Sequence, residues 1–309
     1  AQGVCWRSGP PAAPRNGEKA RQALQPSQPP SPPAPMAGSP AMPIFLFASM
    51  LANFLFIGRA LQDACGRNRP IAPGPAVALL TCAISELCWV VPCFAQCAMT
   101  LFAGYGGDWS PDKSGTGCDV MGFYSQFGSL CSMLATLLVG VITYKAAHNQ
   151  RLPSKQTTVA ASAGIFLLAA LVSALPLAGA TKPYAYSGEG FCYIDWYDVP
   201  QAVIMLLICL PTMAAVVALY GLAARGDWEE KSDLALLVLA FLSAWVLWPP
   251  AGIIGLSGGS FPKHSMIAGA VLGHAQALIN PYLYGVRWRR AMVRHTADSL
   301  PPKTELHVR

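Results

Sequence analysis

Seven long apolar segments alternate with short polar ones along this chain. Each segment is close to the roughly 20 residues that an α-helix needs to cross the hydrocarbon core of a bilayer. The segments cover residues 41–61, 75–101, 119–146, 157–180, 200–224, 234–256 and 265–286. The pattern predicts an all-α membrane protein in which residues 41–286 form a seven-transmembrane helix bundle.

Composition points to the same class of protein. Hydrophobic residues make up 53% of the chain and charged residues 12%, whereas a soluble domain carries about a quarter of charged residues. The net charge of +6 does not indicate nucleic-acid binding, because the basic residues gather on one set of the segments between spans. We therefore expect the lipid bilayer as a partner and no nucleic acid.

The basic residues also predict the orientation of the bundle. They follow the first, third, fifth and seventh spans, at Arg59, Arg67, Arg69, Lys145, Arg151, Lys155, Arg225, Lys231, Arg287, Arg289, Arg290, Arg294, Lys303 and Arg309. The opposite loops contain only Lys113, Lys182 and Lys263. Because cytoplasmic loops carry the excess of Lys and Arg, we expect an extracellular N-terminus and a cytoplasmic C-terminus.

The two ends of the chain differ in character from the spans. Residues 1–40 are rich in proline, as in QPPSPPAPMAGSP, and are expected to be a disordered extracellular tail. Residues 287–309 begin with the basic stretch RWRR and are expected to be a cytoplasmic amphipathic helix and tail. Within this helix, Trp288 is the expected anchor at the membrane interface.

Glu86 is the only acidic residue deep in any predicted span. Placing a carboxyl group in hydrocarbon costs several kcal/mol, so Glu86 is expected to face the bundle interior. There it would bind a proton, a cation such as Na⁺, or polar groups. The structural alternative is a protonated carboxyl group that only bonds a neighbouring helix.

Two of the later spans contain prolines beside polar or aromatic residues. In the seventh span, INPYLYG places Asn280, Pro281 and Tyr284 near the predicted cytoplasmic end. Pro281 removes a backbone hydrogen bond, so this helix is expected to have two possible arrangements. In the sixth span, Trp248 lies two residues before Pro250, which predicts an indole beside a kink or, equally, a packed indole without a switching role.

Cys118 and Cys192 lie where two loops meet on the predicted extracellular, oxidising side. We expect a disulfide between them that pins the loop before the fifth span over the mouth of the bundle.

These motifs together resemble rhodopsin-like G-protein-coupled receptors across residues 41–296. The resemblance is carried by Asn53 in the first span, AISEL in the second, the cysteine pair, Pro211 in the fifth, WPP in the sixth and NPYLY in the seventh. The loop PLAGATKPYAYSGEGFCYIDWY is similar to the loop that caps the retinal pocket of opsins. The resemblance implies a plasma-membrane receptor for a small-molecule ligand, with Trp248, His274 and Asp195 at the pocket and a heterotrimeric G protein as partner.

The chain departs from this family at two functional positions. His274 stands where opsins have the lysine that binds retinal, and an imidazole forms no stable Schiff base, which argues against covalent retinal or any other cofactor. The family's Asp-Arg-Tyr triplet appears as Ile142-Thr143-Tyr144, with Lys145 as the nearest cation. By the resemblance, the G-protein face would consist of Thr143, Tyr144, Lys145 and Glu230.

Three other functions compete with a receptor. A proton- or cation-coupled transporter or channel would use Glu86, and a receptor-like protein without signalling activity would explain the altered triplet. The GLSG stretch at residues 255–258 mimics the nucleophile motif of intramembrane proteases, but it falls in a predicted extracellular loop. We therefore expect the protein not to be an enzyme and to have no metal centre other than an ion site at Glu86.

Overall fold

The computed structural model describes residues 41–66, 70–103, 116–186, 192–228, 231–259 and 263–298. Every described element belongs to one compact unit. The predicted tail at 1–40, Glu230 and the end of the chain after residue 298 lie outside the described residues.

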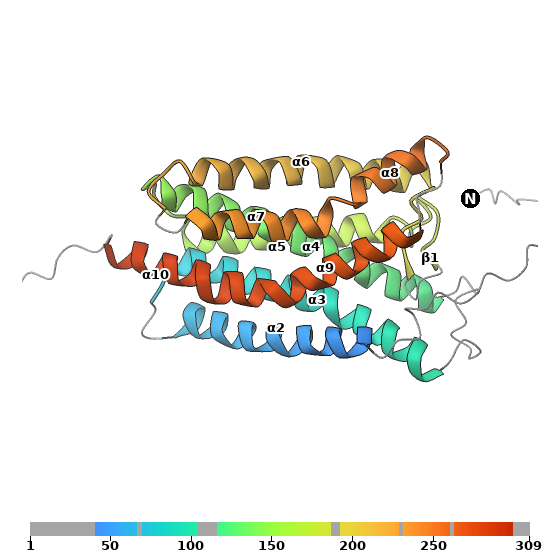
Figure 1. The fold of residues 1–309 in the computed structure, drawn as a ribbon, viewed down its shortest axis with the longest axis horizontal. Coiled ribbons are helices and arrows are strands. Elements are labelled where there is room, and N and C mark those ends of the chain that lie inside the picture. The colour runs from blue at the N-terminus through green and yellow to red at the C-terminus, as the bar shows by residue number, and fades with distance from the viewer. Residues whose placement is uncertain are drawn as a thin grey trace, which may run out of the picture. The chain divides into compact units, whose positions relative to one another are not determined.

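The described chain is almost entirely helical, and its long helices run side by side in alternating directions (Figure 1). In chain order the helices are α2 (Ala41–Cys65), α3 (Pro73–Ala103), α4 (Thr116–Ala147), α5 (Lys155–Ala174), α6 (Val199–Ala223), α7 (Lys231–Trp245), α8 (Trp248–Leu256), α9 (Lys263–Tyr282), the π-helical segment η1 (Leu283–Trp288) and α10 (Arg289–Asp298). Between α5 and α6, the strands β1 (Ala185–Tyr186) and β2 (Cys192–Tyr193) pair antiparallel.

Six of the described helical segments are long and apolar enough to cross a membrane: α2 to α6, and α7 together with α8. The predicted all-α class is confirmed, and these six segments are consistent with the predicted transmembrane bundle. The seventh predicted span, α9, has the expected length but falls outside this group, because it carries polar residues. Three of these, His274, Gln276 and Asn280, are buried inside the protein.

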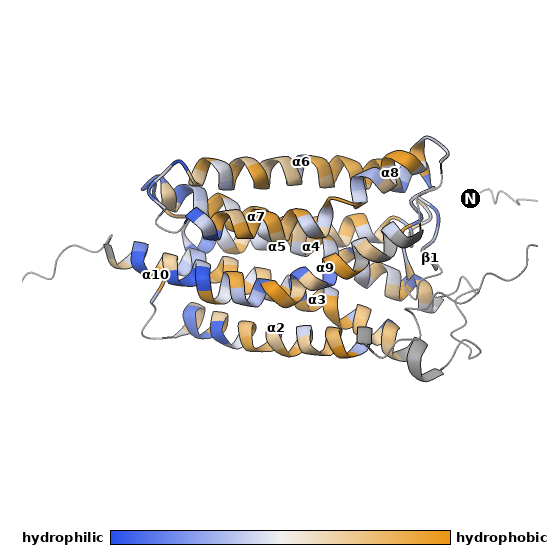
Figure 2. Ribbon diagram, in the orientation of Figure 1, coloured by the Kyte–Doolittle hydropathy of each residue, from blue (hydrophilic) through white to orange (hydrophobic). Residues whose placement is uncertain are grey.

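The two ends of the bundle are chemically different. At one end lie α10 and the connections between α2 and α3, α4 and α5, and α6 and α7; we call it the α10 end (Figure 1). Hydrophilic residues gather there, whereas the middles of the helices are hydrophobic (Figure 2). The β-hairpin marks the opposite end, which we call the hairpin end.

Prolines interrupt the sixth predicted span. Neither Pro249 nor Pro250 has a backbone N–H, so two of the helical hydrogen bonds to the preceding turn cannot form. Accordingly α7 ends at Trp245 and α8 begins at Trp248. The predicted kink is therefore a break between two helices at Val246 and Leu247, which the Trp248 indole N–H bridges by donating to the Ala244 carbonyl at 3.0 Å.

Small residues bring neighbouring helices into close contact. A Cβ atom added to Gly128 on α4 would lie 2.5 Å from the Cα of Trp89 on α3, so only glycine permits this approach of the two backbones. Gly273 on α9 is similarly covered, since an added Cβ would lie 2.7 Å from the Trp89 ring. Trp89 thus packs between two helices at positions where no side chain opposes it.

The chain after the seventh span differs from its prediction. Instead of a separate helix beginning at residue 287, the helix continues from α9 through η1 into α10. The prediction that Trp288 anchors the chain at the membrane interface is wrong, because this side chain is 0% exposed. Its indole is held inside the bundle by a polar contact with α4 that is described below.

Candidate functional site

A proline in α9 frees a backbone carbonyl that a side chain from α2 then binds. Pro281 has no N–H and cannot donate to the carbonyl oxygen of Ala277, four residues earlier. The Nδ2 atom of Asn53, which is fully buried, donates to that oxygen at 2.9 Å and to the carbonyl of Ser49 at 2.9 Å. Asn53 and Pro281 therefore act together, although the sequence presented them as separate motifs.

Nearby on α9, Asn280 connects to the buried carboxylate of α3. Its Nδ2 donates to Glu86 Oε1 at 2.6 Å, and Ser132 Oγ from α4 donates to the same oxygen at 2.7 Å. Glu86 and Ser132 are 0% exposed. The side chains of Asn53, Glu86, Ser132 and Asn280 thus link four helices, and we call these residues the polar junction.

Several buried oxygen atoms of this region have no hydrogen-bond partner within the described part of the chain. They are Glu86 Oε2, Asn53 Oδ1, Ser85 Oγ and Gln276 Oε1. A buried polar atom without a partner is costly, and oxygen atoms are the preferred ligands of small hard cations. The described residues contain no group of three or more His, Cys, Asp or Glu side chains arranged to hold a metal. Glu86 Oε2 is therefore the candidate ligand for the cation expected from the sequence, and a cation at this position stays a prediction.

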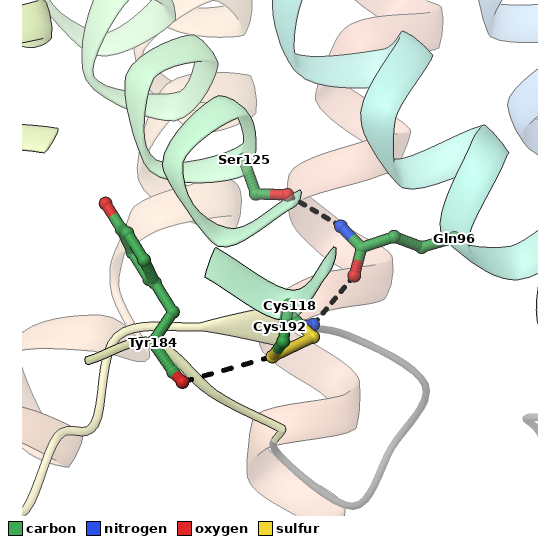
Figure 3. The surroundings of a disulfide bond; sticks show 5 residues. All are labelled: Gln96, Cys118, Ser125, Tyr184 and Cys192. Atoms are coloured by element: carbon green, nitrogen blue, oxygen red, sulfur yellow. Dashed lines mark hydrogen bonds between the residues drawn. A yellow bond between two sulfur atoms is a disulfide. The ribbon is translucent and has the colours of Figure 1, made fainter. Parts of the chain in front are cut away.

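The hairpin end is closed by the predicted disulfide. Cys118 at the start of α4 is bonded to Cys192 in β2, with the two Cα atoms 5.2 Å apart. Gln96 on α3 secures the same strand: its Nε2 donates to Ser125 Oγ at 2.9 Å, and its Oε1 accepts from the Cys192 backbone N–H at 2.7 Å (Figure 3). The hairpin is thus fixed to both α3 and α4.

The hairpin places two aromatic residues against Trp248, the residue at the start of α8. The ring of Trp196 stacks on Trp248 with 5.8 Å between centroids, and Tyr193 packs against it at 5.8 Å. Ser129 on α4 lies 3.1 Å from the Tyr193 hydroxyl. Sequence reasoning missed Tyr193 and Trp196; their positions directly after Cys192 were the available signal.

The three predicted pocket residues have different neighbours. Asp195 is occupied within its own loop, where Lys182 Nζ lies 3.5 Å from Oδ2 and the Tyr197 backbone N–H donates to Oδ1 at 2.9 Å. Its predicted role at the pocket therefore has no contact to support it. His274 is buried against Trp89, with 5.2 Å between the ring centroids.

Trp89, His274 and Trp245 form a second aromatic group, deeper in the bundle. Trp89 stacks on Trp245 from α7 with 5.7 Å between centroids. The group therefore joins α3, α7 and α9 directly below the break between α7 and α8. Trp248 is connected to this part of α7 through its indole N–H, which donates to the carbonyl of Ala244, the residue before Trp245, at 3.0 Å.

The predicted G-protein face is partly covered. Thr143 is 0% exposed, because Trp288 Nε1 donates to its Oγ1 at 2.7 Å. Tyr144 packs on His148 with 4.5 Å between ring centroids, and Lys145 is half-buried. Glu230 lies outside the described residues. Tyr284 is buried close to Tyr220 of α6, so the side chains of η1 contribute to the core.

The comparisons with known proteins add no relative: no protein-family model matches this sequence, and no curated protein matches it.

Proposed function

We propose that this chain is a rhodopsin-like G-protein-coupled receptor: a multi-pass plasma-membrane protein with an extracellular N-terminus that transmits the binding of a small molecule to a heterotrimeric G protein. The observation that carries the proposal is the polar junction. Glu86, Asn280 and Asn53 connect three helices. They do so beside Pro281, which removes the backbone hydrogen bond to the Ala277 carbonyl of α9. Such a site can favour either of two helix arrangements.

The signal would begin at the hairpin end. A ligand that packs against Trp248 would compete with Tyr193 and Trp196 for the same indole surface. Binding shifts the equilibrium between two arrangements only by the difference in affinity of the ligand for them. The two arrangements would differ in the angle between α7 and α8. The break between these helices allows α7 to tilt while α8 stays packed against the hairpin.

The polar junction would pass this change to the α10 end. Trp245 moves with α7 and contacts Trp89, which in turn packs against α9 at Gly273. A shift of α9 would alter the contact of Asn280 with Glu86. A cation bound to the Glu86 carboxylate would favour the arrangement that brings other oxygen atoms close to it. Opening of the α10 end would then expose the face around Thr143 and Tyr144 to a G protein.

The test is nucleotide exchange on a panel of Gα subunits by membranes that contain the full chain, in darkness and in light, with and without added retinal. Ser132→Ala removes one hydrogen bond of the polar junction, and we expect it to change the exchange rate by about fivefold. Ser162→Ala is the matched control: it removes another buried serine hydroxyl, which bonds Thr81 outside the junction. We expect exchange by this control to remain at the parent rate.

The outcomes separate the candidate functions. Exchange that responds to Ser132→Ala but not to Ser162→Ala supports the receptor, and light dependence would indicate an opsin-like receptor that binds retinal without a Schiff base. A proton or sodium flux that depends on Glu86, without exchange on any subunit, would instead favour a transporter. Surface-expressed protein with neither activity would favour a receptor-like protein that does not signal.

A further inference from the structure

Three consecutive residues at the boundary of η1 and α10 each bind a different helix. Arg287 forms an ion pair with Asp233 in the first turn of α7. Trp288 donates its indole N–H to Thr143 of α4 at 2.7 Å. The guanidinium group of Arg289 binds Asp63 near the end of α2 through two hydrogen bonds, of 2.5 and 2.7 Å. We call Arg287, Trp288 and Arg289 the latch residues.

The partners of the latch residues are sheltered from solvent. The side chains of Asp63 and Asp233 are 2% and 5% exposed, and Thr143 is 0% exposed. A surface ion pair contributes little, but removing one member of a buried pair leaves a charge without compensation. Moving α7 away from the C-terminal helix would break these contacts. The free-energy cost of breaking them therefore opposes that movement.

Helix α7 is positioned to make such a movement. It is separated from α8 by the break at Val246 and Leu247, whereas Asp233 lies near its opposite end, roughly 20 Å away at 1.5 Å per residue. A tilt of about 15° at the break would displace Asp233 by about 5 Å over that length. A displacement of this size separates the carboxylate from Arg287.

We propose that the latch residues hold α7 against α2 and α4 and keep the α10 end of the bundle closed, and that this end opens when α7 tilts at the break and the latch releases. That the latch residues keep the α10 end closed is inferred from their contacts alone. That this closure prevents G-protein binding rests on the proposed receptor function. The latch also gives Thr143 a structural role. Its hydroxyl accepts a hydrogen bond from Trp288, and the side chain is buried.

The test measures the distance between α7 and α5 by double electron–electron resonance on the purified full chain. Spin labels are attached at Ser232→Cys on α7 and Gln156→Cys on α5, both exposed positions. The background carries Cys65→Ser, which removes the exposed free cysteine of the described residues, and Cys5→Ser, because Cys5 lies outside them. The parent should show one short distance. Arg287→Gln should raise the population at a distance about 5 Å longer by about tenfold, and Trp288→Phe by about fivefold, the factor for one hydrogen bond.

Each variant has a matched control. Arg290→Gln removes the charge of an exposed arginine three residues from Arg287. Trp228→Phe removes a buried indole N–H that has no partner among the described residues. Longer distances in the two latch variants with parent distances in both controls would support the latch. Parent distances in all four, or equal changes in the controls, would overturn it. Because no G protein is present, a missing exchange activity would count against the proposed function and leave this result intact.

Discussion

Replacing Asn280 by alanine should reveal how strongly the polar junction stabilises the protein. The substitution removes the donor that lies 2.6 Å from Glu86 Oε1 and leaves only Ser132 on that oxygen. Hydrogen bonds to charged groups contribute about 1.5–3 kcal/mol in soluble proteins, and interhelical bonds in membranes average about 0.6 kcal/mol. We therefore expect Asn280→Ala to lower the free energy of unfolding by about 1–2 kcal/mol, between these two values.

Free cysteines of the chain supply the assay. Cys82, Cys93, Cys131 and Cys209 are buried, so a thiol-reactive fluorophore reports unfolding as they become accessible. Cys65→Ser removes the exposed free thiol of the described residues, and Cys5→Ser removes the thiol that lies outside them, so that neither reacts beforehand. At one fixed heating rate, the expected loss corresponds to a fall in Tm of about 2–6 °C.

A second background tests whether Glu86 is the acceptor. In Glu86→Gln the acceptor is neutral, and a hydrogen bond to a neutral acceptor is about half as strong as one to a carboxylate. Asn280→Ala should therefore cost about half as much in this background as in the parent. Equal losses in the two backgrounds would refute a charge-assisted bond from Asn280 to Glu86.

Three further predictions test the other parts of the structure. Cys118→Ser, Cys192→Ser and the double variant should lose the same stability, about 4 kcal/mol for a loop of 74 residues, as measured by Tm; an additive loss in the double variant would contradict the pairing. Gly128→Ala should strongly reduce the yield of folded protein because of the contact with α3, whereas Gly164→Ala, where an added Cβ meets nothing within 4 Å, should be neutral; similar yields of the two would contradict the close packing. Replacing choline chloride by NaCl should raise the Tm of the parent but not of Glu86→Ala, and an equal rise in both would exclude a sodium site at Glu86.

The helices were predictable because each depends on a long local pattern. A run of about 20 apolar residues has few structural solutions in a bilayer, and the observed helices begin and end within a few residues of the predicted segments, except at the end of the fourth. The break in the sixth segment was likewise visible in the sequence, because adjacent prolines remove two donors from one turn. The disulfide was predictable because both cysteines fall in loops on the predicted extracellular, oxidising side of the membrane.

The contacts between helices were harder to predict. The basic neighbours of Trp288 are typical of an interfacial anchor, and nothing local indicates that its N–H meets Thr143, a residue 145 positions away. Asp195 was assigned to the pocket by its place in the loop, and its ion pair with Lys182 depends on how that loop folds. The loop instead contributes Trp196, whose packing on Trp248 depends on how the hairpin folds back over the bundle.

Nucleotide exchange by the latch variant Arg287→Gln tests the receptor proposal most directly, because release of the latch replaces the unidentified ligand. After its longer α7 distance has been verified, the variant is mixed with each Gα subunit, without ligand, beside the parent and the double variant with Asn280→Ala. The account predicts exchange at least several times faster than the parent on one subunit class, and a different rate when Asn280 is also replaced. An open variant that accelerates exchange on no subunit would contradict the assignment of this protein as a G-protein-coupled receptor.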